Sequence, residues 1–131
     1  MKTVKYIVVF LSIMFLGIVL LEQVPGVMTP TAEAHEALMF NLFKISLLDD
    51  ITHALSGILG FIALFLGYRV SVKYLMLIGG YYTLDAIFFI LYGLISGQSL
   101  VDNFLLNAPH VGISVLCAYA LLKSVKRIEL V

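Results

Sequence analysis

The stretch LLDDITHALSGILGFIALFLGY, residues 47–68, opens with two carboxylates and continues as a long apolar run. No Asp, Glu, Lys or Arg follows Asp50 until Arg69. A membrane-spanning helix needs about 20 mostly apolar residues, because each residue rises about 1.5 Å and the hydrocarbon layer is about 30 Å thick. The stretch therefore predicts a transmembrane helix with polar residues at its N-terminal end.

The rest of the chain has the same character. Its 131 residues are 62% hydrophobic and 12% charged, with a mean hydropathy of +1.09, whereas soluble domains are about 45–50% apolar. Three further segments are long and apolar enough to span, and none shows the alternation of a membrane barrel. We predict an all-α, single-domain bundle over residues 1–131, with transmembrane helices at about 4–24, 47–68, 74–96 and 104–122. Residues 31–46 are predicted to lie at the outer interface or to extend the second helix outward.

The charges of the chain set its orientation and exclude one class of partner. Eight basic and eight acidic residues give a net charge of zero, so no excess of positive charge favours nucleic acid. Basic residues near span ends stay on the cytoplasmic side. Seven of them fall on one side of the predicted topology: Lys2, Lys5, Arg69, Lys73, Lys123, Lys126 and Arg127. We therefore predict a multi-pass protein of the cell membrane with both termini cytoplasmic.

The first span has a second interpretation as a signal peptide. Ala32-Glu33-Ala34 resembles a signal-peptidase site. The site lies more than ten residues beyond Leu21, which is farther than the usual short spacer. We expect an uncleaved anchor.

Two halves of the chain resemble each other. When His53 is aligned with His110, Ser46 and Asp50 match Asn103 and Asn107. Each set has the spacing i, i+4, i+7, which places three side chains on one helical face. The pattern suggests two weakly related helical hairpins, repeated in parallel about an axis along the membrane normal.

Three motifs carry a resemblance to a known family. NLFKISLLDDITHALSG (41–57), LIGGYYTLDAIFFILYGL (77–94) and LNAPHVGISVL (106–116) resemble the small four-helix membrane proteins grouped as the domain of unknown function 4383 family. The resemblance covers about residues 41–122. It implies the four-helix fold and matches Asp50, His53, Asn107 and His110 to the polar positions of the family. It implies no specific activity.

His53 and His110 admit two interpretations. Imidazoles on facing helices of a bundle can be axial ligands of a b-type haem or bind a metal, and Gly57 and Gly112 would leave room for the macrocycle. Alternatively, no cofactor is bound, and His53 hydrogen-bonds Asp50 while His110 hydrogen-bonds Asn107.

Asp85 is predicted to lie about midway along the third span, where a carboxylate costs about 2.5–3.5 kcal/mol on insertion scales. It is therefore expected to face the bundle interior. Tyr81 and Tyr92 are predicted on the same face as hydrogen-bond donors to it. Asp85 is then either a proton or small-cation relay, or a protonated acid that fastens helices together.

Little in the sequence indicates catalysis. We find no Ser-His-Asp set, no phosphate-binding Gly loop and no full zinc ligand set, and so predict no enzyme and no catalytic residue. Small residues at four-residue spacing permit close helix approach in lipid. The leading expectation is therefore an accessory subunit that associates with other membrane proteins or with itself in the bilayer. The alternatives are a haem or metal carrier and a proton or small-cation pathway through Asp85.

Overall fold

The computed structural model describes residues 2–32 and 36–128. Four helices dominate it: α1 (Lys2–Leu21), α2 (Leu47–Leu66), α3 (Tyr68–Ile95) and α4 (Leu100–Ile128). Each contains a window long and apolar enough to cross a membrane. The predicted all-α bundle of four transmembrane helices is thereby confirmed. The possible cleavage site at 32–34 falls largely outside the described residues.

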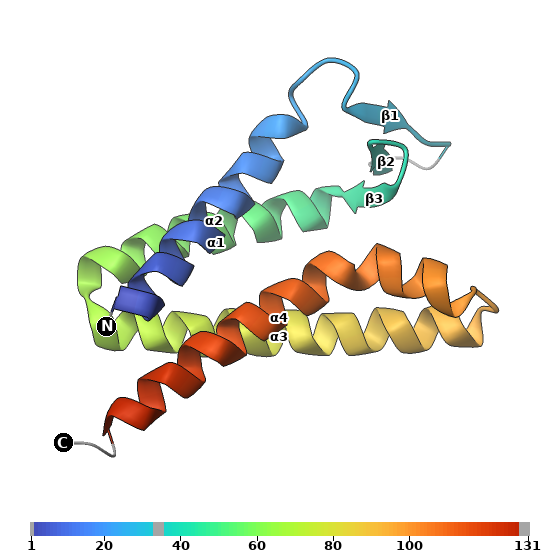
Figure 1. Ribbon diagram of the computed structural model, residues 1–131. Coiled ribbons are helices and arrows are strands. Elements are labelled where there is room, and N and C mark those ends of the chain that lie inside the picture. Colours follow the sequence, from blue (N-terminus) through green and yellow to red (C-terminus); the bar gives the residue numbers. More distant parts are fainter. Residues whose placement is uncertain (1, 33–35, 129–131) are drawn as a thin grey trace.

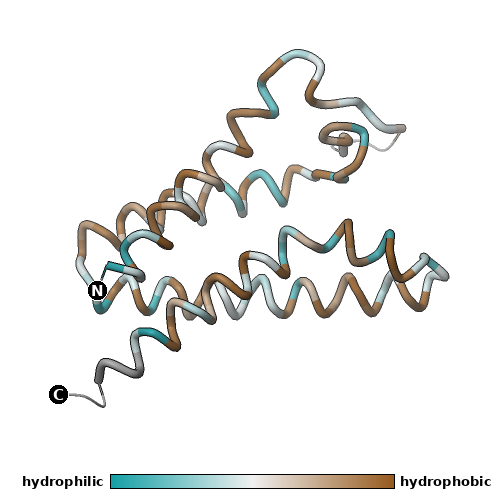
Figure 2. The backbone as a smooth tube through the Cα atoms, in the orientation of Figure 1, coloured by the Kyte–Doolittle hydropathy of each residue, from teal (hydrophilic) through white to brown (hydrophobic). Residues whose placement is uncertain are grey.

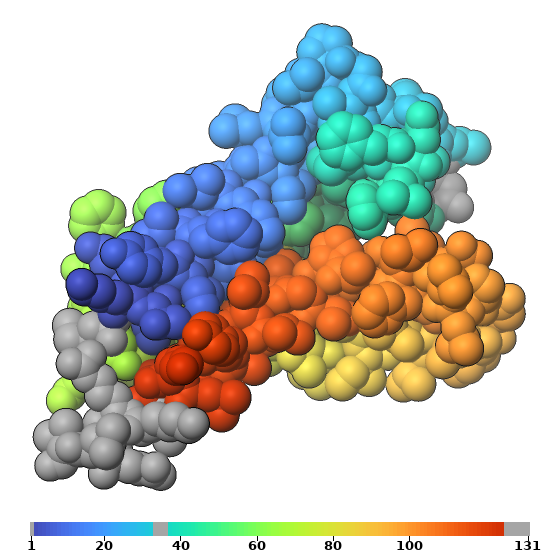
Figure 3. All heavy atoms as spheres, in the orientation of Figure 1, coloured from blue at the N-terminus to red at the C-terminus, as the bar shows by residue number. Residues whose placement is uncertain are grey.

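The helices form two antiparallel pairs (Figure 1). α1 packs along α2 and α3 along α4, α2 also contacts α3, and α1 contacts α3 and α4. Figure 3 shows the atoms of α1 (blue) lying against those of α4 (orange to red). The start of α1 and the end of α4 lie at one end of the bundle together with the α2–α3 turn, and we call this the terminal end. The opposite end carries a small sheet and the α3–α4 turn, and we call it the sheet end.

Helix boundaries differ from the prediction at the turns. The predicted loop at residues 69–73 is helical, because a single residue, Gly67, separates α2 from α3. Its φ of +101° lies in a region that glycine reaches without a steric penalty. α4 begins at Leu100, before the predicted start, because the Ser99 hydroxyl accepts a hydrogen bond from the backbone N–H of Asp102 at 3.1 Å. α1 ends at Leu21 rather than at residue 24.

Of the two alternatives for residues 31–46, the outward extension of α2 is wrong. Its place is taken by an antiparallel sheet in the order β1 (Met28–Pro30), β2 (Glu36–Met39) and β3 (Phe43–Ser46), and β3 runs directly into α2. The hairpin turns through Phe40 and Asn41, whose φ values are +53° and +57°. The side chain of Asn41 accepts a hydrogen bond from the Thr29 hydroxyl at 2.6 Å, which ties the turn to β1.

The interior is apolar and the surface is apolar as well. Val8, Leu11, Phe15, Leu75 and Cys117 are fully buried where the helices meet. Large side chains such as Phe65 and Ile95 are 89% and 86% exposed. Apolar residues run along all four helices in Figure 2. Such a surface fits hydrocarbon rather than water as its surroundings.

Candidate functional site

An acid and an imidazole meet between α3 and α4. Oδ2 of Asp85 lies 2.8 Å from Nδ1 of His110, and the two side chains are only 21% and 28% exposed. The ring N–H is not aimed at the oxygen as in a linear hydrogen bond, so the contact is chiefly electrostatic. Pairing of this kind reduces the cost of a carboxylate within the membrane.

One ring from each helix joins a stack beside this pair. The centroid of His53 on α2 lies 5.8 Å from that of Phe15 on α1. Phe15 lies 5.3 Å from Tyr82 on α3, which in turn lies 5.4 Å from His110 on α4. The sequence did not single out Phe15 or Tyr82. Tyr82 could have been found as an aromatic residue three positions before Asp85, whereas nothing distinguishes Phe15 among nine Phe residues.

The surroundings of the two imidazoles do not fit a haem. Phe15 and Tyr82 occupy positions against His53 and His110. The space beside Gly57, expected to admit the macrocycle, is filled by Leu16, whose Cγ would lie 2.6 Å from an added Cβ. Within residues 2–32 and 36–128, no group of three or more His, Cys, Asp or Glu side chains could hold a metal ion.

The predicted matching of Ser46 with Asn103 is wrong. Ser46 lies outside α2 and caps it, since its hydroxyl accepts from the N–H of Asp49 while Asp49 accepts from the backbone of Ser46. Asn103 is buried inside α4. The structural counterpart of Ser46 is Ser99, whose hydroxyl accepts from the N–H of Asp102 and donates to its carboxylate. Aligning α2 with α4 by their capping serines therefore gives a register about one helical turn away from the register that aligns their histidines.

The expected partners of His110 and His53 also differ. Asn107 donates from Nδ2 to the backbone oxygen and to Oδ1 of Asn103, at 2.8 and 2.9 Å, and not to His110. Nδ2 of Asn103 donates to the carbonyl of Ile90 on α3 at 2.8 Å. Asn103 thus fastens α4 to α3 near the sheet end, while Asn107 bonds Asn103 within α4. Nδ1 of His53 has no hydrogen-bond partner among the described residues.

Tyr81 and Tyr92 are not the hydrogen-bond donors to Asp85 that the sequence predicted. Their side chains are 46% and 60% exposed, and neither hydroxyl hydrogen-bonds to Asp85 in the part of the chain that the structure describes. Tyr81 packs edge-on against Tyr82, and Tyr92 stacks on Phe88. The face of α3 that turns inward is that of Tyr82 instead.

Acidic residues gather where α1 ends and α2 begins. The Glu22 carboxyl lies beside that of Asp50, and Oε1 of Glu22 and Oδ1 of Asp50 are buried without a hydrogen-bond partner among the described groups. Burial, followed by Asp50 and then Asp49, raises the pKa of Glu22 from 4.5 to about 7. His53 lies close enough to Asp49 and Asp50 to sense their charges.

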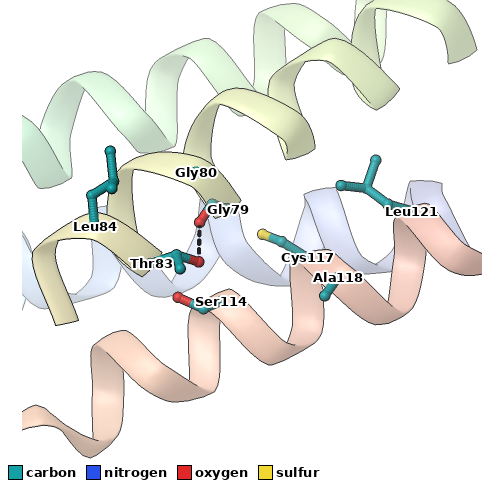
Figure 4. A pocket seen from close by; sticks show the side chains of 8 residues that line it. All are labelled: Gly79, Gly80, Thr83, Leu84, Ser114, Cys117, Ala118 and Leu121. Atoms are coloured by element: carbon teal, nitrogen blue, oxygen red, sulfur yellow. Dashed lines mark hydrogen bonds between the residues drawn. The ribbon is translucent and has the colours of Figure 1, made fainter. Parts of the chain in front are cut away.

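A hollow of about 370 Å³ lies between α3 and α4 toward the terminal end (Figure 4). An added Cβ on Gly79 would lie 2.7 Å from Cβ of Cys117, so the helices touch at its base. No carboxylate or imidazole lines it. The lining residues are Gly79, Gly80, Thr83, Leu84, Ser114, Cys117, Ala118 and Leu121.

Comparison with known proteins gives a family and no activity. The sequence model described as "Domain of unknown function (DUF4383)" matches residues 5–124, which extends the resemblance seen in residues 41–122 to include α1. No curated protein and no solved structure matches the chain. This small membrane protein of four transmembrane helices therefore belongs to the DUF4383 family.

Proposed function

We propose that this protein is a non-enzymatic protein of the cell membrane that reversibly binds a proton at Asp85 and His110. The observation that carries the proposal is the 2.8 Å approach of the carboxylate to the imidazole between α3 and α4. Histidine is the side chain whose charge ordinarily changes between about pH 5 and 8.

Among the described residues, carboxyl and imidazole groups approach this pair from the sheet end only. Glu22, Asp50 and His53 supply two carboxyl groups and an imidazole whose Nδ1 has no hydrogen-bond partner among the described residues. Toward the terminal end, Val8, Leu11 and Leu75 fill the interior and are fully buried. This arrangement favours a proton site closed toward the terminal end over a continuous proton or small-cation pathway.

Infrared difference spectra of reconstituted protein between pH 5 and pH 8 test the proposal. We expect the parent to show carboxyl and imidazole bands that change together and that Asp85→Asn removes. The exposed acid of Asp102 provides a matched control, because Asp102→Asn should keep those bands. Identical spectra for the parent and Asp85→Asn would refute the site.

Flux measurements separate proton binding from transport. Liposomes containing the parent should show no proton or cation flux above that of empty liposomes. Flux that is present in the parent and abolished by Asp85→Asn would mean that the protein forms a pathway through Asp85 and not a closed site.

A second candidate function, that of an accessory subunit, is favoured by the hollow between α3 and α4. Gly80 and Ala118 are exposed on its two walls, and small side chains on both walls let another transmembrane helix approach closely. Gly80→Leu would fill the hollow and should release a partner helix in native-lipid extracts. Val115→Leu enlarges an exposed residue on α4 outside the lining and should retain it. A parent that is monomeric and without associated protein would exclude this role.

The cytoplasmic location of both termini is likewise a proposal, supported by the basic residues of the terminal end. Cysteine at Gln98 should react with an impermeant thiol reagent added outside cells, and cysteine at Arg69 should not. Both positions are exposed and lie at opposite ends of the bundle. The reverse labelling pattern would invert the topology.

A further inference from the structure

A second hollow, of about 290 Å³, lies at the terminal end between the start of α1 and the α2–α3 turn. Lys2, Val4 and Lys5 line it from α1, and Leu64 lines it from α2. Gly67, Tyr68 and Ser71 complete its wall at the turn. It therefore combines two lysine residues with apolar residues in one wall.

Among the described residues, no acidic side chain compensates the positive charge of this hollow. No Asp or Glu occurs between Met1 and Glu22, or between Asp50 and Asp85. Lys2 and Lys5 are exposed, and among the described residues neither has an acidic partner. Arg69 and Lys73 in the first turns of α3 add to the positive field at this end.

The start of α3 contributes to the same field. Gly67 precedes the helix and provides no side-chain hydrogen bond to its first turn. The backbone N–H groups at a helix start carry partial positive charge and favour anions. Gly67 and Tyr68 place this start in the wall of the hollow.

From these features we infer that the hollow binds the phosphate headgroup of an anionic phospholipid. The two lysines and the start of α3 supply the charge for the phosphate. Val4 and Leu64 supply an apolar surface for the glycerol and upper acyl chain of the lipid. A free phosphate ion has neither of these groups. Basic pockets between transmembrane helices are typical binding places for anionic lipid headgroups. The inference is independent of Asp85 and His110, which lie farther along the bundle.

Native mass spectrometry of the full-length, delipidated protein tests the inference with two lipids of identical acyl chains. The parent should retain phosphatidylglycerol about tenfold more strongly than phosphatidylcholine, because basic side chains near the surface each attract anionic lipid. The variant Lys2→Gln/Lys5→Gln should lose this preference. Lys123→Gln is the matched control, since Lys123 also lies toward the terminal end, over the ring of Tyr119, but does not line the hollow.

Three results would overturn the inference. The first is equal retention of the two lipids by the parent. The second is an unchanged preference in the double variant, with circular dichroism showing that it is folded. The third is displacement of phosphatidylglycerol by millimolar inorganic phosphate, which would assign the hollow to a free anion. Loss of preference in the double variant alone supports the lipid site.

Discussion

Gly60 of α2 faces the hydroxyl group of Ser12 of α1 with no space between them for a methyl group. An added Cβ would also lie 2.9 Å from the hydroxyl oxygen of Tyr74 on α3. That hydroxyl donates to the carbonyl of Ser56 on α2 at 3.0 Å. Three helices thus meet at Gly60, where a glycine permits close approach and polar groups satisfy one another.

Gly60→Ala should destabilise the bundle by about 1–3 kcal/mol, the usual cost of inserting volume into a packed interior. Thermal unfolding in detergent, followed by circular dichroism, measures the change. Gly17→Ala is the matched control, because nothing lies within 4 Å of an added Cβ there. Equal stability of the two variants would show that α1 and α2 are less tightly packed at Gly60.

The buried amide of Asn103 should matter for the joining of α3 and α4. Asn103→Ala removes the hydrogen bond to the Ile90 carbonyl and leaves Asn107 without its side-chain partner. Hydrogen bonds between transmembrane helices average about 0.6 kcal/mol and reach about 1.7 kcal/mol, so we expect a loss in that range by the same unfolding assay.

Ser114→Ala is the matched control, because it removes a hydrogen bond within one helix and not one between two helices. The Ser114 hydroxyl donates to the carbonyl of His110 in its own helix, at 2.8 Å. Its removal should change the free energy of unfolding less than Asn103→Ala does. A larger loss for Ser114→Ala would contradict the fastening role of Asn103.

The length of the apolar runs made the helical bundle predictable, whereas the positions of the turns were not predictable. Four segments that need to span about 30 Å of hydrocarbon leave few alternatives to a helical bundle. The sheet escaped prediction because Phe40 and Asn41 adopt positive φ without a glycine to signal the turn. The basic residues at 69–73 suggested a loop, but they lie on the first turns of α3 after a break made by Gly67 alone.

The candidate site was only partly predictable because pairing across helices depends on their relative rotation. Sequence periodicity indicated that Asp85 and His110 each need a partner, but not that they are partners of each other. Tyr81 and Tyr82 are about 100° apart on a helix of 3.6 residues per turn. Which one turns inward is decided by the neighbouring helices, and Tyr82 is the buried one.

Glu22 should make stability depend on pH. Its pKa is raised from 4.5 to about 7, so the folded protein holds this proton more tightly than the unfolded chain. The resulting stability is fully present below about pH 4.5, declines as pH rises, and is lost above about pH 7. Thermal unfolding of the parent and of Glu22→Gln across this interval isolates the contribution, because the amide cannot titrate.

The groups that surround Glu22 set the control for this measurement. Asp50 and Asp49 act on Glu22 from the start of α2, whereas Asp102, at the start of α4, is bound to Ser99 and is not among the groups that raise the pKa of Glu22. Asp102→Asn should leave the pH dependence as in the parent. The same slope in Glu22→Gln and the parent would show that Glu22 does not hold the proton.

A double-mutant cycle on Asp85 and His110 measures whether the two side chains act as a unit. Asp85→Asn leaves the imidazole without its acid, and His110→Gln leaves the carboxylate without its base, so each single change exposes an unpaired polar group inside the bundle. The double variant removes both groups at once. Its loss of unfolding free energy should therefore be smaller than the sum of the single losses, by about 0.5–3 kcal/mol as for residues in contact. Unfolding in detergent at pH 6, where histidine is ordinarily partly protonated, is the suitable condition. Additive losses would mean that the 2.8 Å approach contributes no coupling and that Asp85 is stabilised by other means.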